Sequence, residues 1–189
     1  MTLASYISCL RIVLIVPIIY LLHLGEGHRS FGEGTNFYFY FAFSLFVIAG
    51  LTDYLDGYIA RRTNTETQLG ALLDLIADKL LVSLVMVWLV YIEMHPLVAI
   101  PALIIVSREL VISTLRQYVI EKRGKKDLSV SFIGKSKTTI QIIAISTLIL
   151  AQEITSIHTL ALIAIWFAAF FSLYSLFTYV SEWFKHFSN

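Results

Sequence analysis

Four aspartates lie in two stretches of the chain that are otherwise apolar enough to form membrane helices: Asp53 and Asp56, then Asp74 and Asp78. A carboxylate in an apolar span is costly unless a cation, a partner or a water-filled cavity stabilises its charge. The first pair is spaced i,i+3 and the second i,i+4, so each pair lies on one face of its helix. Two such helices packed side by side would bring the four carboxylates together, which predicts a divalent-metal site.

The composition indicates an integral membrane protein. Of the 189 residues, 58% are hydrophobic and 14% are charged, and the mean hydropathy is +0.78. Soluble domains average about 45–50% apolar and about 25% charged residues. The net charge of +1 gives no sign of nucleic-acid binding, and none is expected. With a single cysteine, Cys9, an intrachain disulfide is excluded.

Six stretches are long and apolar enough to cross a membrane, since a spanning helix needs about 20 mostly apolar residues. The expected spans are approximately Ile7–His23, Phe37–Ala60, Leu69–Tyr91, Leu97–Val119, Thr138–Ala151 and Leu160–Phe184. We therefore expect an all-α, polytopic membrane fold with six transmembrane helices. Residues 1–189 are expected to form one domain, with a short N-terminal interfacial segment before the first span.

Basic residues are concentrated on one side of these spans. The connections after the second and fourth spans are rich in lysine and arginine, whereas those after the third and fifth contain neither. This asymmetry follows the positive-inside rule. Both termini and all four aspartates are therefore expected on the cytoplasmic side of the membrane.

The residue types around the aspartates indicate phosphoryl chemistry. Carboxylate oxygens suit hard cations such as Mg²⁺ or Mn²⁺, and Mg²⁺ commonly binds a few carboxylates together with substrate phosphates. In such a site the metal holds a pyrophosphate and one carboxylate activates a nucleophile. Gly50, Gly57 and Ala60 share a helix stripe with Asp53, and such small residues let another helix or a ligand approach the backbone closely.

The aspartates belong to a longer pattern with fixed spacing. It runs Asp53-x2-Asp56-Gly57-x2-Ala60-Arg61, then eight residues, Gly70, three residues, Asp74, three residues and Asp78. This pattern resembles, without a gap, the signature of the CDP-alcohol phosphotransferase family. The resemblance implies a six-helix homodimeric membrane enzyme that transfers a phosphatidyl or similar group from a CDP-linked donor to an alcohol and releases CMP.

Further motifs resemble the bacterial branch of this family that makes phosphatidylglycerophosphate. They are Ala77-Asp78-Lys79-Leu80, Ser107-Arg108-Glu109 followed by Arg116, the segment 131–139, and Gln141. The branch implies CDP-diacylglycerol as donor, sn-glycerol 3-phosphate as acceptor, membrane lipid as surroundings and the bacterial cytoplasmic (inner) membrane as location. Two positions depart from the branch: Ser5 stands where an Asn nucleotide contact is usual, and Leu75 stands where Pro is usual.

The resemblance also implies roles for individual residues. Two Mg²⁺ or Mn²⁺ ions would be held by Asp53, Asp56, Asp74 and Asp78, and Asp78 resembles the general base. Contacts to the donor would come from Gly57, Ala60, Arg61, Thr67 and Gly70.

The phosphate of the acceptor needs cations of its own. An arginine in an apolar span is costly without an anion. Arg108 and Arg116 are spaced i,i+8 near one face of the fourth span, and Lys135 and Lys137 lie at the cytoplasmic start of the fifth. These four residues are the candidates for the acceptor site. Two structural alternatives remain open: an ion pair of Arg108 with Glu109 or an aspartate, and a topology-setting role for the two lysines.

Other functions also fit parts of the sequence. Within the family the acceptor could be inositol phosphate, phosphatidylglycerol or serine, although the basic residues favour a phosphorylated one. A divalent-metal transporter is the competing function from another class, because carboxylates within a membrane can mark an ion path. Such a path should distribute acidic residues across the membrane depth, whereas the four aspartates are expected at one depth.

Overall fold

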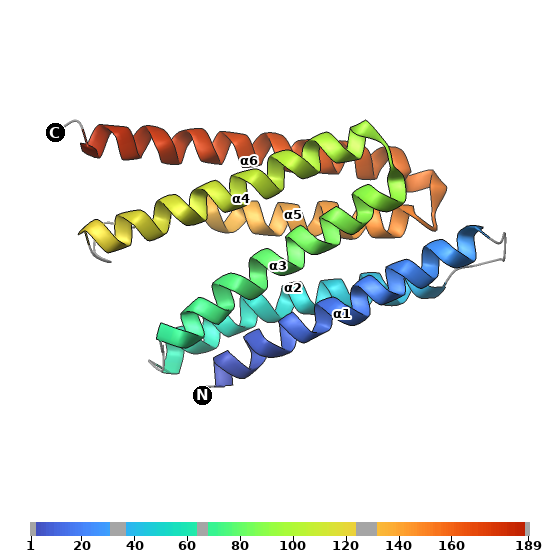
Figure 1. The fold of residues 1–189 in the computed structure, drawn as a ribbon, viewed down its shortest axis with the longest axis horizontal. Helices are drawn as coiled ribbons and strands as arrows, with labels where there is room; N and C mark the ends of the chain where they lie inside the picture. Colours follow the sequence, from blue (N-terminus) through green and yellow to red (C-terminus); the bar gives the residue numbers. More distant parts are fainter. Residues whose placement is uncertain (1–2, 31–36, 64–67, 124–131, 188–189) are drawn as a thin grey trace.

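The computed structural model consists of long helices (Figure 1). It describes residues 3–30, 37–63, 68–123 and 132–187, and the side chains of residues 6–29, 37–52, 70, 72–115 and 138–181. The elements are α1 (Leu3–Ser30), α2 (Phe37–Thr63), α3 (Gln68–Glu93), α4 (Pro96–Arg123), α5 (Phe132–Ala151), the 3₁₀ turn η2 (Thr155–Ile157) and α6 (His158–Phe187). The predicted all-α fold with six helices is confirmed.

Within the described residues, α1 begins at Leu3 and continues without a break through the first expected span. The physical reason is local, because residues 3–16 contain no glycine or proline that would end a helix. Pro17 lies inside α1.

The helices have the length and composition of membrane spans. Within the described residues, four segments are long and apolar enough to cross a membrane. They are Tyr6–Arg29, Leu72–Glu93, Pro96–Leu115 and Thr155–Ser181. The apolar segments of α2 and α5 are shorter over the described residues, Phe37–Thr52 and Thr138–Ala151. Large apolar side chains point outward, for example Val16 at 70% and Phe170 at 72% exposure, as expected where lipid replaces water. The chain is a multi-pass membrane protein.

The helices pack in two groups of three. α1 packs on α2 and α3, α6 packs on α4 and α5, and contacts of α2 with α5 and of α3 with α4 join the groups. Figure 1 shows the N-terminus and the C-terminus at the same end of the bundle. We call this the terminal end. An even number of spans requires this arrangement, and α3 and α5 consequently both run away from the terminal end.

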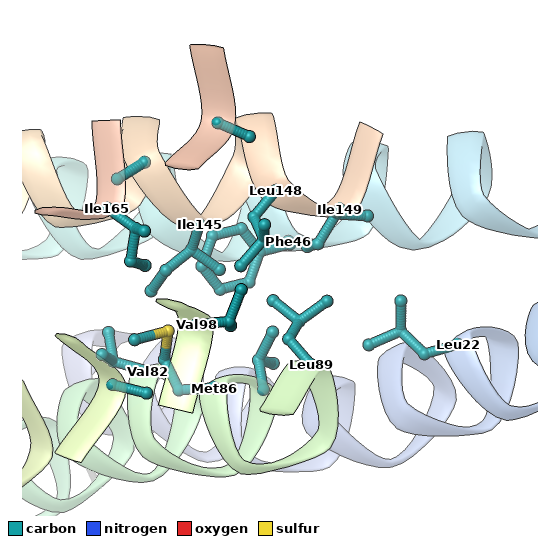
Figure 2. Packing of buried hydrophobic residues seen from close by; sticks show 14 of the residues in the cluster. Leu22, Phe46, Val82, Met86, Leu89, Val98, Ile145, Leu148, Ile149 and Ile165 are labelled. Atoms are coloured by element: carbon teal, nitrogen blue, oxygen red, sulfur yellow. The ribbon is translucent and has the colours of Figure 1, made fainter. Parts of the chain in front are cut away.

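Apolar side chains from all six helices fill the middle of the bundle (Figure 2). They are at most 5% exposed and include Leu22, Phe46, Val82, Met86, Leu89, Val98, Ile145, Leu148, Ile149 and Ile165. In lipid, close packing of this kind holds helices together through van der Waals contact, because the surrounding tails are as apolar as the side chains. This apolar layer separates polar contacts near the terminal end from others at the opposite end.

A polar cluster joins four helix ends at the opposite end of the bundle. Gln152 donates from Nε2 to the Glu93 carboxylate at 2.6 Å, and His158 Nε2 lies 3.2 Å from each oxygen of that carboxylate. Arg29 Nη1 donates to Gln152 Oε1 at 3.0 Å. The cluster therefore ties the end of α1 to the ends of α3 and α5 and to the start of α6.

Gly50 allows α2 to approach α5 closely. A Cβ atom built at Gly50 would lie 3.1 Å from Cδ1 and 3.3 Å from Cγ2 of Ile142. The prediction of a close approach at this small residue is confirmed, whereas Gly57 and Ala60 on the same stripe lie outside the described side chains.

We expect Gly50→Val to destabilise the bundle, because the added side chain overlaps Ile142 and overpacking costs about 1–3 kcal/mol. The matched control is Gly27→Val, since a Cβ atom at Gly27 in α1 meets nothing within 4 Å. The measurement is the apparent unfolding temperature of each purified variant in detergent. Equal temperatures for the two variants would contradict the close α2–α5 contact.

Candidate active site

The four predicted aspartates lie at matching heights in two successive antiparallel helices. Asp53 lies ten residues before the end of α2, and Asp78 lies ten residues after the start of α3. At a rise of 1.5 Å per residue, both lie about 15 Å from those helix ends. Asp56 and Asp74 lie correspondingly nearer the ends. The backbone therefore supports one layer of carboxylates, although the side chains of Asp53 and Asp56 lie outside those described.

Asp74 is held by two residues of α1. Arg11 Nη1 lies 3.4 Å from Asp74 Oδ1, and Ser8 donates from Oγ to the same oxygen at 3.5 Å. The Arg11 side chain is completely buried, whereas the Asp74 side chain is 45% exposed. The pair thus positions the carboxylate while leaving much of it accessible to a ligand.

Arg11 stands at the arginine position with which the branch usually opens, but no role in the site was predicted for it from the sequence. The signal was present, because an arginine within an apolar span requires an anion at its own depth. The sequence does not identify Asp74 as that anion, because Arg11 and Asp74 are 63 residues apart and meet only when α1 packs on α3.

Arg108 connects α4 with α6. It is 6% exposed, donates from Nη2 to Ser175 Oγ at 2.8 Å, and places Nη1 3.4 Å from Glu109 Oε1. The structural pair with Glu109, considered as the alternative for this residue, is therefore present. Lys79 donates from Nζ to the Glu109 carbonyl oxygen at 3.2 Å and lies 3.9 Å from Glu109 Oε2.

The contact between Lys79 and Glu109 sets the register of α3 against α4. Asp78 lies one residue nearer the terminal end than Lys79, and Arg108 lies one residue farther from it than Glu109. On these antiparallel helices the contact therefore brings Asp78 and Arg108 to within about 3 Å of each other in height. Asp78 is half-buried at this height. One layer of the bundle thus contains Asp78, whose carboxylate could take a proton, and Arg108, a buried cation that could bind an anion.

The other predicted site residues lie outside the described side chains, and their roles stay predictions. They are Asp53, Asp56, Gly57, Ala60, Arg61, Thr67, Arg116, Lys135 and Lys137. Gly70 is described and lies one turn before Asp74 in α3.

The described part of the site fits a hard divalent cation. Asp74 and Asp78 supply carboxylate oxygens one helical turn apart, and such oxygens are the ligands that these ions prefer. Among the side chains that the structure describes, no group of three or more His, Cys, Asp or Glu residues converges. The contribution of Asp53 and Asp56 to such a site stays a prediction.

The family profile for CDP-alcohol phosphatidyltransferase matches residues 1–174. The chain belongs to this family. It is thus a membrane-embedded transferase, and enzymes of the family use divalent metal ions.

The curated relatives are similar over most of their length. A protein of Haemophilus influenzae is 38% identical over 136 residues, which are 72% of this chain and 73% of the relative. Proteins of Salmonella choleraesuis and Escherichia coli K12 are 42% and 41% identical over 139 residues, 72% of this chain and 75% of each relative. All three are named CDP-diacylglycerol–glycerol-3-phosphate 3-phosphatidyltransferase.

We expect Asp74→Ala to lower stability by about 1–3 kcal/mol, because the buried Arg11 guanidinium loses a charged acceptor. Asp74→Asn should cost less, since its amide oxygen can still accept from Ser8 and Arg11. The measurement is the apparent unfolding temperature in detergent without added divalent metal. If Asp74→Ala were as stable as the wild type, the pair with Arg11 would have no structural role.

Proposed function

We propose that the protein transfers the phosphatidyl group of CDP-diacylglycerol to sn-glycerol 3-phosphate, forming phosphatidylglycerophosphate and CMP in phospholipid biosynthesis. The observation that carries the proposal is the buried cation Arg108 near the height of Asp78, within the fold of a phosphatidyltransferase. The names of the relatives at 38–42% identity support the same substrates.

In this proposal the donor lies on the α2 and α3 signature. Its CDP group contacts the residues of the signature and the following loop, namely Gly57, Ala60, Arg61, Thr67 and Gly70. Two Mg²⁺ or Mn²⁺ ions would be held by Asp53, Asp56, Asp74 and Asp78, and when bound they would offset the charge of the pyrophosphate. The Arg11 contact supports this assignment, because it positions Asp74 on the accessible side of α3.

The proposed transfer step uses Asp78 as general base. Asp78 takes the proton from the C1 hydroxyl of the acceptor, and the freed oxygen forms a bond to the phosphorus that carries diacylglycerol. The bond from this phosphorus to the oxygen of CMP breaks, and CMP leaves with that oxygen. Arg61 offsets the negative charge on the pyrophosphate. General-base assistance contributes about 10²–10⁴-fold to such rates.

The acceptor phosphate would bind Arg108, with Arg116, Lys135 and Lys137 as further cations. Ser175 and Glu109 hold the Arg108 guanidinium in place, so less side-chain freedom is lost when the phosphate binds. Such a group of cations would favour a phosphorylated acceptor over serine. Inositol phosphate and phosphatidylglycerol also carry a phosphate, and direct competition between acceptors distinguishes them.

The proposal places the terminal end of the bundle in the bacterial cytoplasm. The loops rich in lysine and arginine support this orientation. The water-soluble acceptor and CMP would then enter and leave on the cytoplasmic side. A homodimer in the cytoplasmic membrane is expected from the family resemblance.

The apolar packing in the middle of the bundle disfavours an ion-transport function. Fully buried apolar side chains, among them Val85, Met86 and Ile145, lie between the polar layer at the terminal end and the cluster around Glu93. A hydrated divalent cation would lose its water there without gaining oxygen ligands, which is highly unfavourable.

The decisive measurement is CMP release from CDP-diacylglycerol by the purified protein in detergent with Mg²⁺. We expect release that requires the metal and sn-glycerol 3-phosphate, with little release when inositol phosphate, phosphatidylglycerol or serine replaces it. The matched control is Asp78→Asn, which keeps the size of the side chain but cannot accept the proton, and should lower turnover at least about 10²-fold. Release with another acceptor alone would replace the proposed substrate.

Arg108→Ala should raise the KM for sn-glycerol 3-phosphate about 10–100-fold, because a charge-assisted hydrogen bond to phosphate is lost. The KM for CDP-diacylglycerol should change less than about twofold. Ser175→Ala is the graded control, since it removes the 2.8 Å support of the guanidinium but keeps the charge, and should have a smaller effect. An unchanged KM for the acceptor in Arg108→Ala would exclude Arg108 from the phosphate site.

A further inference from the structure

Gln141 is a buried amide whose donor group has no hydrogen-bond partner in the described structure. The residue is 2% exposed, and its Nε2 atom is buried without an acceptor. Buried polar groups are nearly always hydrogen-bonded, because an unpaired donor loses its water without compensation. The amide therefore signals a ligand or a water molecule at this position.

The face of α5 that carries Gln141 points toward α3. Gln141, Ile145, Leu148 and Gln152 follow one another at spacings of four, three and four residues, so they share a face of the helix. Ile145 and Leu148 belong to the apolar cluster with Val82 of α3 (Figure 2), and Gln152, just after α5, contacts Glu93 at the end of α3.

The contact of Gln152 with Glu93 also gives the height of Gln141. α3 and α5 run in the same direction, and Gln141 precedes Gln152 by as many residues as Val82 precedes Glu93. Gln141 therefore lies at about the height of Val82, one helical turn from Asp78. Asp78, Arg108 and Gln141 thus lie within about one helical turn of each other along the bundle axis and come from α3, α4 and α5.

The acceptor of the proposed reaction has three polar groups, and the proposed function uses two of them. Asp78 takes the proton from the C1 hydroxyl, and Arg108 binds the phosphate. The C2 hydroxyl lies between them and needs a partner, because an unpaired hydroxyl in a buried site is costly. A glutamine amide can donate to that hydroxyl oxygen and accept from its proton.

We propose that Gln141 binds the C2 hydroxyl of the acceptor and selects a glycerol phosphate over a phosphorylated alcohol that lacks this hydroxyl. The inference rests on the proposed function. It adds a specificity-determining residue on α5 to the catalytic group on α3 and the phosphate ligand on α4. A pocket built to pair with a hydroxyl discriminates strongly against an analogue without it, because its own polar group is then left unpaired.

The test compares sn-glycerol 3-phosphate with 3-hydroxypropyl phosphate, which lacks only the C2 hydroxyl, in the wild type and in Gln141→Leu. We expect the wild type to prefer sn-glycerol 3-phosphate by about tenfold or more in kcat/KM. Gln141→Leu should lose this preference through a fall in kcat/KM for sn-glycerol 3-phosphate alone. The KM for CDP-diacylglycerol should not change.

Two further variants distinguish the loss of a contact with the C2 hydroxyl from a general loss of structure in α5. Ser146→Ala removes a different buried polar group without a partner, a hydroxyl that lies five residues farther along α5 and about 140° around it. This variant should leave the preference unchanged. Gln141→Asn keeps an amide but withdraws it by one methylene, and should retain part of the preference.

The outcomes separate this inference from the proposed function. If the wild type released no CMP with sn-glycerol 3-phosphate, the proposed function would fail and this inference with it. If the wild type turned over and Gln141→Leu slowed both acceptors equally, or neither, Gln141 would have a structural role and the inference alone would be wrong.

Discussion

The absence of water around the middle of the helices constrains every charged side chain that lies within the bundle. A charge within the bundle is tolerated only where another helix supplies a counter-charge or hydrogen-bond partners. Arg11 satisfies this constraint through Asp74 of α3, and Arg108 through Ser175 of α6, with Glu109 of its own helix as a further partner. These contacts consequently determine how α1 is positioned on α3 and how α4 is positioned on α6.

The same contacts prepare a site for anionic substrates. Arg11 and Arg108 are almost completely buried, yet the carboxylate partner of Arg11 is nearly half exposed. Charges that are fixed before a ligand arrives need little reorganisation when it binds, which is the main physical requirement for stabilising a transferring phosphoryl group. The polar layer therefore serves both helix packing and chemistry.

Most of the apolar packing lies away from the polar layer along the bundle axis. The apolar middle and the cluster around Glu93 hold the helices together away from the terminal end, where the polar layer lies. A site rich in like-charged aspartates is intrinsically unfavourable without its cations. Packing elsewhere can offset that cost, and the contact of Asp74 with Arg11 offsets part of it within the site itself.

The sequence by itself determined the class of protein, the six helices and the four aspartates of the signature, because hydropathy and helical spacing are local properties. It also indicated Arg108 and its neighbour Glu109. It did not indicate that residues before Ile7 continue α1. The tertiary structure alone decided that Arg11 meets Asp74, that Lys79 meets Glu109, and that Gln141 lies about one helical turn from Asp78 along the bundle axis. Such contacts depend on the rotation and register of each helix against its neighbours, and these are set by packing between residues far apart in the chain.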